Sequence, residues 1–245
     1  ADAVNANGTS VWNNSSPWVF ESAWEFVSID APSYVTNNGY PMLQGLGNSQ
    51  VIYWTDEAVW SAAGQAFNNY TLSGSDSQGG PYLIQNEWDL AYLSWTIYTN
   101  NPIQASHVSS TYYYYSGIYF KQTADLDLSA YYWQPIGIYY LRDGTSARRY
   151  FSGCYDGGES IVSGLFTPAG KGNGYNNQGL FGDVYSPSAT NLDTISNVSV
   201  IDSFVQGYAY VGGVVGVVSG NSTVTNCYNS GSVSGGDDVG GVVGR

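Results

Sequence analysis

The chain has 245 residues, enough for one large or two smaller domains, and its formal net charge is -13 with a sequence pI of about 4.1. This acidic balance excludes a nucleic-acid backbone or an anionic lipid surface as the expected partner, because like charges repel. Charged residues make up only 10% of the chain and aromatic residues 16%, so the surface must be polar through Asn, Ser, Thr, Gly and Tyr, which is typical of an extracellular protein.

No membrane span is expected. The longest run of apolar residues and glycine covers 211–218, far short of the roughly 18 to 20 residues that a spanning helix needs. The start of the chain has no signal-peptide pattern, so an extracellular or cell-surface location is inferred from composition alone.

Residues 1–50 form an aromatic-rich N-terminal segment. Asn37, Asn38 and Gly39 are a turn signal, and residues with strand propensity flank them. We expect two short β-strands around this turn.

Residues 51–80 are expected to be a connecting segment with a short helix. The run 51–54 has the composition of a strand, and Thr55 is placed to cap a helix over 56–67 whose first turn is acidic. The Gly- and Ser-rich stretch 68–81 then predicts a loop, which is the best candidate for a boundary within the chain.

Residues 81–110 are expected to hold a capping helix and a loop. Asn86 is a good N-cap with Asp89 three residues later, and aromatic and small residues recur at helical spacing over 87–98. The pattern predicts an amphipathic helix with Trp88, Ala91, Tyr92 and Trp95 on one face. Such a helix is suited to cover the otherwise unpaired edge of a first strand.

Residues 111–245 consist of short β-type runs separated by Gly, Asn and Asp. The runs before the repeats are 112–122, 133–138, 151–155, 160–166 and 179–184. The hexapeptide Val-Gly-Gly-Val-Val-Gly then occurs at 211–216 and again 28 residues later at 239–244. A repeat of that length predicts stacked units that bury their apolar faces against one another. The predicted fold is therefore all-β: a right-handed parallel β-helix (solenoid) of five or six turns, with a short capping helix and an aromatic-rich N-terminal β segment.

The two cysteines, Cys154 and Cys227, are expected to be buried thiols. With stacked strands about 4.8 Å apart, we place them three layers from each other, too far for a disulfide, whose Cα atoms lie within about 7 Å.

Several motifs between 81 and 245 together resemble the GLUG-motif repeat regions. They include Trp-Asp-Leu-Ala-Tyr-Leu at 88–93, Ala-Asp-Leu-Asp-Leu-Ser at 124–129, Trp-Gln-Pro-Ile-Gly at 133–137 and the two Val-Gly-Gly-Val-Val-Gly copies. The resemblance implies a parallel β-helix and a surface role in large prokaryotic surface and secreted proteins, including adhesin-like ones. It carries over no catalytic residue. The aromatic segment 18–43 resembles the closing part of such a region, although here it precedes the repeats.

No group of residues has the spacing of a catalytic or metal site, and no cofactor is expected. His107 is the single histidine and has no sequence neighbours suited to a triad or a zinc site, so we interpret it as a plain loop residue. Asp125 and Asp127 share a strand face, as the paired acids of a glycosidase would, but turn hydrogen bonds are the favoured explanation.

Other acids are weaker candidates. Asp156, Asp183 and Asp202 would be catalytic only if the fold brought them together. Asp237 and Asp238 follow two glycines, where a solvated turn is favoured over a Ca²⁺ site because no calcium-loop signature is present.

The tyrosine clusters are the best candidates for contact with a ligand or partner, since exposed aromatic faces stack on sugars or on proteins. Stacked ladders that cover the helix flanks are nevertheless the favoured interpretation. The candidate contact residues are Tyr112, Tyr114, Tyr131, Trp133 and Tyr139.

Two further sets of residues are singled out. Six Asn-X-Ser/Thr sequons, some of which arise by chance in a chain rich in Asn, Ser and Thr, would carry sugar in an organism that glycosylates exported proteins: Asn7, Asn13, Asn14, Asn69, Asn197 and Asn221. Aromatic residues near the start and valines of the second repeat are expected to form an assembly interface between copies, through Trp18, Phe20, Trp24, Phe26, Tyr40, Leu43, Val239, Val242 and Val243.

Together these features predict a non-enzymatic structural or adhesive β-helix module of an extracellular or cell surface, able to assemble head to tail into a filament or sheath. Its expected partners are other copies of itself, neighbouring repeat domains, surface glycans or host proteins. The alternative is a carbohydrate-binding or carbohydrate-active β-helix protein, a lyase or hydrolase, which requires converging acids in a tyrosine-lined cleft.

Overall fold

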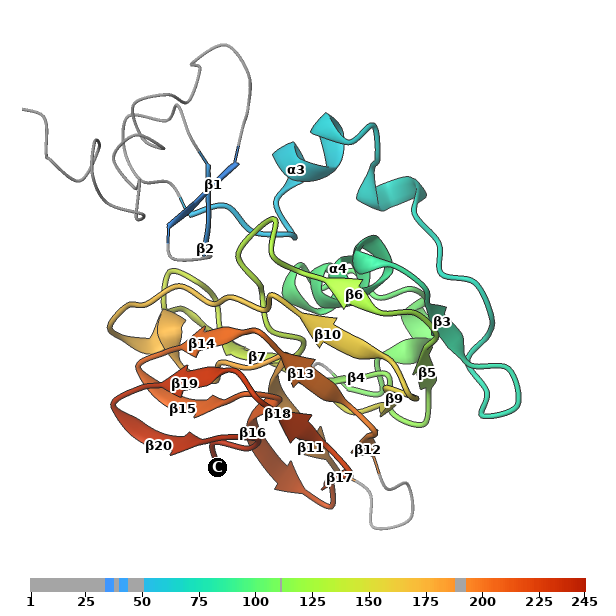
Figure 1. The fold of residues 1–245 in the computed structure, drawn as a ribbon. Helices are drawn as coiled ribbons and strands as arrows, with labels where there is room; N and C mark the ends of the chain where they lie inside the picture. The colour runs from blue at the N-terminus through green and yellow to red at the C-terminus, as the bar shows by residue number, and fades with distance from the viewer. Residues whose placement is uncertain (1–33, 38–39, 44–50, 111, 188–192) are drawn as a thin grey trace, which may run out of the picture. The chain divides into compact units, whose positions relative to one another are not determined.

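The computed structural model describes residues 34–37, 40–43, 51–110, 112–187 and 193–245 (Figure 1). The chain divides into two compact units, residues 1–52 and 53–245. Each unit is described by itself.

In the first unit, β1 (Tyr34–Asn37) pairs antiparallel with β2 (Tyr40–Leu43), with Asn37 opposite Tyr40. The expectation of two short strands at this point is confirmed. Trp18, Phe20, Trp24 and Phe26 lie outside the described residues.

The second unit begins with a shorter helix than expected. Helix α3 spans Glu57–Ala62, and its N-cap is Asp56, so the expectation of a Thr55 cap and of a helix reaching 67 is wrong. Gly64 adopts a positive φ of 71°, a conformation that ends a helix and that glycine adopts without strain. Tyr53 makes an isolated parallel bridge to Tyr132 in place of the expected strand. The 3₁₀ helix η1 follows at Phe67–Asn69.

Helix α4 spans Glu87–Tyr98, and the Asn86 side chain accepts a hydrogen bond from the Asp89 N–H at 3.0 Å, as expected of an N-cap. Its expected amphipathic character is wrong. Ala91 and Tyr92 are buried, but so are residues on the other faces. The helix is covered on one side by β3 and β8 and on another by the α3–η1 segment, where Trp60 lies 5.1 Å from Trp88 between ring centroids. The 3₁₀ helix η2 (Ala105–His107) follows.

The rest of the unit is mostly β-strand, and nearly all of its strand pairs are parallel. One five-stranded sheet has the order β17-β12-β9-β5-β3. Its strands are β3 (Tyr82–Ile84), β5 (Tyr119–Gln122), β9 (Cys154–Asp156), β12 (Thr194–Ser196) and β17 (Thr223–Thr225). A second sheet contains β6 (Leu126–Asp127), β10 (Ile161–Ser163), β13 (Ser199–Ile201) and β18 (Tyr228–Asn229).

A third sheet carries the candidate site. It runs in the order β16-β11-β8-β4, with β7 paired antiparallel to β8. Its strands are β4 (Tyr113–Tyr114), β7 (Ile138–Tyr140), β8 (Ser146–Phe151), β11 (Phe181–Ser186) and β16 (Val215–Gly220). The 3₁₀ helix η3 (Asn173–Tyr175) lies between β10 and β11 in the chain. Strand β8 was not expected, because its Ser-Ala-Arg-Arg sequence has a polar composition.

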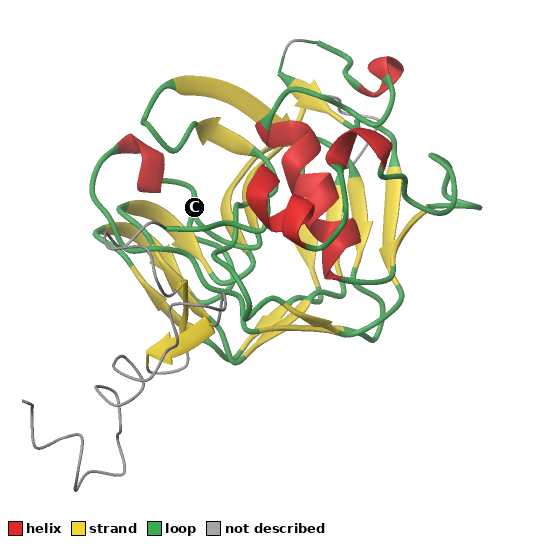
Figure 2. Ribbon diagram, turned by 90° about the horizontal axis from the view of Figure 1, so that it is seen from above, coloured by secondary structure: helices red, strands yellow, loops and turns green. Residues whose placement is uncertain are grey.

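Two parallel pairs complete the unit, β14 (Phe204–Gln206) with β19 (Ser232–Ser234) and β15 (Ala209–Gly212) with β20 (Asp237–Gly240). In these pairs the two sequence repeats lie side by side, since Val211 is opposite Val239. The 28-residue repeat therefore predicted correctly that the corresponding strands of the two copies pair with each other. Figure 2 shows the helices lying over the strands when the molecule is viewed from above.

The core lies between the parallel sheets. Phe120, Phe151, Tyr155 and Phe181 come from different strands and are buried, with neighbouring ring centroids 5.1 to 5.9 Å apart. Apolar residues of later strands, such as Val200, continue this core. Inward-facing residues of β17 to β20, such as Val224 and Val233, are half-exposed because no further strand covers them among the described residues.

Neither cysteine forms a disulfide, as expected, but both are half-buried rather than buried. Cys154 begins β9 and Cys227 follows β17, and β12 alone separates these strands in the sheet. The expected separation of three layers is therefore wrong. Burial raises the pKa of both thiols, so both stay protonated at neutral pH.

Candidate functional site

Two of the five candidate contact residues are excluded by burial. The side chain of Tyr114 is fully buried, and so is that of Trp133, whose indole N–H donates to the Leu180 carbonyl at 2.9 Å. Within the Tyr112–Tyr115 cluster, Tyr113 takes the outward position on β4 and stacks on Tyr185 with ring centroids 5.2 Å apart. The expected strand parity was therefore off by one residue.

The other three candidate contacts are accessible. Tyr112 is 42% exposed. Tyr131 is half-buried and packs edge-on against Trp54 at 4.9 Å, which gives it a structural role. Tyr139, on β7, is half-buried and lines a groove.

The acids proposed for catalysis do not come together. Asp125 accepts a hydrogen bond from the Ile161 N–H, and Asp127 accepts one from the Ser129 N–H, each at 2.9 Å. Asp156 lies on β9 in another sheet, where it accepts from the Gly158 N–H at 2.9 Å. Asp127 thus makes the expected turn hydrogen bond, whereas the partner of Asp125 lies on the neighbouring strand β10, so that part of the expectation is wrong.

Asp237 and Asp238 begin strand β20 rather than occupying a turn, so that expectation is wrong. Asp238 lies 3.7 Å from the Arg245 guanidinium. Asp202 is exposed and adopts a positive φ of 46°. Within the described part of the chain, no cluster of His, Cys, Asp or Glu is suited to hold a metal ion.

The interpretation of His107 as a plain loop residue is wrong. It ends η2, is only 4% exposed, and packs against Tyr82 and Tyr115. Neither ring nitrogen has a hydrogen-bond partner, since Asp76 at 3.7 Å is too distant for one. Burial lowers the pKa of His107, although the Asp76 carboxylate opposes this shift.

The sequons differ in accessibility. Asn69 and Asn221 are exposed. The Asn197 amide donates to Asp156 at 2.7 Å, and its oxygen accepts from the Asn226 amide at 2.6 Å, so this side chain is tied into a row of hydrogen bonds. Asn7, Asn13 and Asn14 lie outside the described residues.

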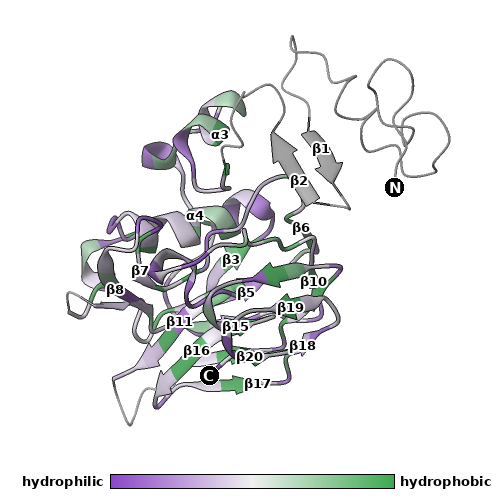
Figure 3. Ribbon diagram, turned by 90° about the vertical axis from the view of Figure 1, so that its left-hand side faces the viewer, coloured by the Kyte–Doolittle hydropathy of each residue, from purple (hydrophilic) through white to green (hydrophobic). Residues whose placement is uncertain are grey.

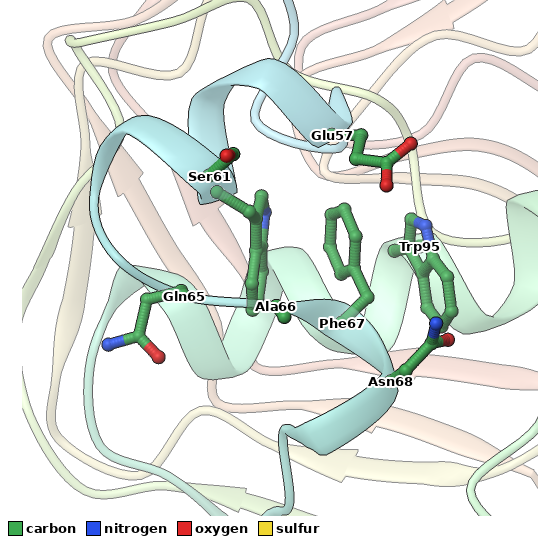
Figure 4. Close-up of a pocket in the computed structure, with 8 residues that line it drawn as sticks. Glu57, Ser61, Gln65, Ala66, Phe67, Asn68 and Trp95 are labelled. Carbon is green, nitrogen blue, oxygen red and sulfur yellow. The ribbon is translucent and has the colours of Figure 1, made fainter.

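A hollow of about 290 Å³ lies between α3, η1 and α4 (Figure 4). Its aromatic residues contact one another: Phe67 stacks on Trp95 with ring centroids 4.4 Å apart and lies 3.9 Å from Trp60. Because Phe67 fills the space beside the two indoles and Trp60 is fully buried, this hollow offers little aromatic surface to a ligand.

A larger open groove, of about 650 Å³, lies on the outer face of the third sheet. Strands β8, β11 and β16 form its floor, and β7 forms one wall; these four strands lie next to one another in Figure 3. The segment 173–177 and Tyr210 of β15 contribute the remaining wall. We call it the tyrosine groove. Its lining residues are Tyr139, Tyr140, Tyr150, Asn173, Asn176, Asn177, Asp183, Tyr185, Tyr210, Val217, Val218, Ser219 and Arg245.

Strand pairing, parallel for β4, β8 and β11 and antiparallel for β7, brings the tyrosines together. Tyr113 is opposite Tyr150 in the register of β4 and β8, and Tyr150 lies 5.4 Å from Tyr185 on β11 between ring centroids. Tyr139 contacts Tyr140 at 4.7 Å and Tyr150 at 6.2 Å. The groove therefore presents a continuous aromatic surface built from strands far apart in the sequence.

Asp183 is the one carboxyl that lines the groove in the described part of the chain. It is 3% exposed, and its Oδ2 accepts a hydrogen bond from the Asn177 amide at 2.9 Å. Burial raises the pKa of Asp183 to about 7, and the Asn177 hydrogen bond opposes this shift. Burial and the nearby Asp183 raise the pKa of Tyr150 to about 12, so this hydroxyl stays neutral.

Sequence patterns missed most of this site. Tyr139 was the one candidate contact that lines it; Tyr150, Asp183 and Tyr185 were not proposed as contacts. The sequence signal that could have located the groove is the spacing of tyrosines along 112–185. That spacing does not show which tyrosines lie side by side, because this depends on how the strands pair.

Compared with models of protein families, with curated proteins and with solved structures, the chain matches none of them. The described helices are all too short or too polar to cross a membrane.

Proposed function

We propose that residues 53–245 form a right-handed parallel β-helix that acts as an adhesive module of an extracellular or cell surface, and that the tyrosine groove binds a glycan. The β-helix is supported by the parallel pairing of repeat-related strands, and its hand by the general right-handed rule for parallel crossovers. The resemblance to GLUG-motif regions and the low content of charged residues support the surface location.

The tyrosine groove is the observation that carries the binding proposal. Tyrosine rings stack on the apolar faces of sugars, while their hydroxyls and nearby amides hydrogen-bond to sugar hydroxyls. Asn173, Asn176 and Ser219 supply such polar groups beside the rings. An open groove also suits an extended oligosaccharide better than an enclosed small-molecule ligand.

Binding without catalysis is the function that the geometry favours. Glycoside hydrolysis normally needs two carboxyl groups across the scissile bond, and among the described residues the groove has only Asp183. Asp127 and Asp156 lie in other sheets, Asp125 directly precedes β6, and all three accept backbone hydrogen bonds.

A glycan array followed by calorimetry on the purified chain tests this proposal. We expect Tyr139→Ala and Tyr185→Ala each to weaken binding about fivefold, because each removes a stacking surface worth about 1 kcal/mol. Tyr208→Ala is the matched control, since Tyr208 is 47% exposed and does not line the groove. Binding that survives both groove substitutions, or no glycan binding at all, would overturn it.

A second candidate function is self-assembly, which is favoured by the apolar residues of β20 and the segment after it. Val239 is 44% exposed, and Val242 and Val243 are half-exposed. A strand supplied by another copy or by a neighbouring repeat domain would bury them. We expect the purified chain to associate with rising concentration and Val239→Lys to reduce this. A monomer that light scattering finds at all concentrations would count against it.

A further inference from the structure

The charges around the tyrosine groove differ from those of the whole chain. The chain carries 19 acidic and 6 basic residues, yet one acid, Asp183, lines the groove. That carboxyl is buried, and its pKa of about 7 leaves it largely neutral in mildly acidic solution. The groove is thus less negatively charged than the chain as a whole.

One arginine lines this groove, and a second lies beside one of its tyrosines. Arg245 lines it directly, is 64% exposed in its side chain, and lies 5.3 Å from the centre of the Tyr210 ring. Arg148 is exposed on β8, and its guanidinium lies 5.2 Å from the centre of the Tyr139 ring. Arg245 has one weak carboxylate neighbour, Asp238 at 3.7 Å, whereas Arg148 has none within 4 Å in the described part of the chain.

The other two arginines of this region serve the fold. Arg142 binds Asp56 at 2.6 Å and Gln134 at 2.8 Å, and its guanidinium covers the Tyr53 ring. Arg149 donates to the carbonyls of Ile97 and Tyr98, at the C-terminal end of α4, where a cation is favourable. Arg148 and Arg245 have no comparable structural contacts, so their guanidinium groups remain available to a ligand.

We propose that the tyrosine groove selects acidic glycans, oligosaccharides that carry carboxylate or sulfate groups, and that Arg148 and Arg245 bind the anionic substituents. This inference rests on the proposed glycan-binding function. A guanidinium matches carboxylate and sulfate oxygens with paired, charge-assisted hydrogen bonds, while the neighbouring tyrosines stack on the sugar ring. The net charge of -13 disfavours a nucleic acid, the other polyanion that stacks on aromatic rings.

Calorimetry with the purified full chain tests the inference at fixed pH and ionic strength. The probes are an oligogalacturonide, a sulfated chondroitin oligosaccharide, a cello-oligosaccharide of equal length and a single-stranded oligonucleotide. We expect at least one of the two acidic sugars to bind ten or more times as tightly as the neutral one, and the comparison between them identifies the anionic group.

Substitutions then test whether each arginine binds the anionic groups of the glycan. Arg148→Asn is chosen because Arg148 has a positive φ of 51°, which asparagine tolerates. We expect it to lower acidic-glycan affinity at least fivefold and to weaken its salt dependence, with neutral-glycan binding unchanged. Arg245→Gln gives an independent second variant. Lys121→Gln is the control, because Lys121 is a half-exposed cation on β5, outside the groove.

Four results would overturn the inference. Equal binding of neutral and acidic glycans would overturn the inference and leave the proposed function standing. Absence of any glycan binding would overturn both. An oligonucleotide that binds as tightly as the acidic glycans, or affinity that both arginine variants leave unchanged while circular dichroism shows them folded, would also overturn the inference.

Discussion

The stability of the protein depends on pH through Asp183, which lines the tyrosine groove. Its folded-state pKa of about 7 lies above its ordinary value of 3.8, so the folded protein binds this proton more tightly than the unfolded chain does. The resulting stability is fully present below about pH 4 and is lost as pH rises through 7. Between pH 5 and 7 the loss is on the order of 2 kcal/mol.

We predict that Asp183→Asn abolishes this part of the pH dependence. Asparagine retains an acceptor for the Asn177 amide and carries no titrating group, so the urea midpoint should change less between pH 5 and 8 than in the unmodified chain. Asp202→Asn is the control, because Asp202 is exposed. Parallel pH profiles of the Asp183 variant and the unmodified chain would show that Asp183 is not a buried, protonated carboxyl.

The pKa shift of His107 affects the pH dependence of stability in the opposite direction. Burial lowers its folded-state pKa below 6.5, so the unfolded chain binds the proton more tightly, and stability falls as pH drops below 6.5. We predict that His107→Leu removes this loss, measured by urea unfolding at pH 5 and 7. Since neither imidazole nitrogen has a hydrogen-bond partner, the variant should be as stable as the unmodified chain at pH 7. A large destabilisation at pH 7 would point to a hidden polar contact.

At the scale of elements, the row formed by Asp156, Asn197 and Asn226 connects consecutive strands of one sheet. Asn197 and Asn226 have positive φ values of 56° and 50°, which asparagine tolerates better than most residues, and their amides hydrogen-bond across the row. The sequon at Asn197 therefore follows from a structural requirement for asparagine, with serine two positions later on β13.

We predict that a glycosylating host modifies Asn69 and Asn221 and leaves Asn197 unmodified in the folded protein. A glycan on the Asn197 nitrogen would replace a donor hydrogen of an amide that binds Asp156 at 2.7 Å, and it would crowd the row. Glycopeptide mass spectrometry of secreted protein measures the occupancy of each site. High occupancy at Asn197 in folded protein would show that the row is dispensable.

Local elements were the most predictable from sequence. The bounds and cap of α4 depend on residues within one turn of each other, so the pattern at 86–98 predicted both. Its burial on several sides could not be predicted, because the partners that cover it, Trp60 and strand β8, come from elsewhere in the chain.

The groove was less predictable for a related reason. Its floor depends on the register in which β8, β11 and β16 pair, and one residue of slip turns every side chain to the other face. The sequence repeats clearly only between 195 and 244, so earlier strands offered no internal register. For that reason the sequence predicts Tyr114 in place of Tyr113 as the outward residue, and leaves Asp183 as one isolated acid among several.

At the scale of the whole second unit, the side chains of the inner strands are more buried than those of the last strands in the chain. Ile195 and Val205 are fully buried, whereas their partners Val224 and Val233 on β17 and β19 are half-exposed. Apolar burial stabilises by about 25 cal/mol per Å², so strands that bury less are held less firmly. Regions with fewer buried contacts open at lower free energy.

We predict that amide hydrogen exchange is slowest in β9 and β12 and fastest in β19 and β20. The experiment also tests self-assembly, because a second copy docked on β20 would bury Val239 and protect the adjacent amides in a concentration-dependent way. Val239→Lys should remove that extra protection while exchange in β9 stays unchanged. Uniform protection across all strands at low protein concentration would contradict the expected gradient, and protection independent of concentration would argue against assembly through this edge.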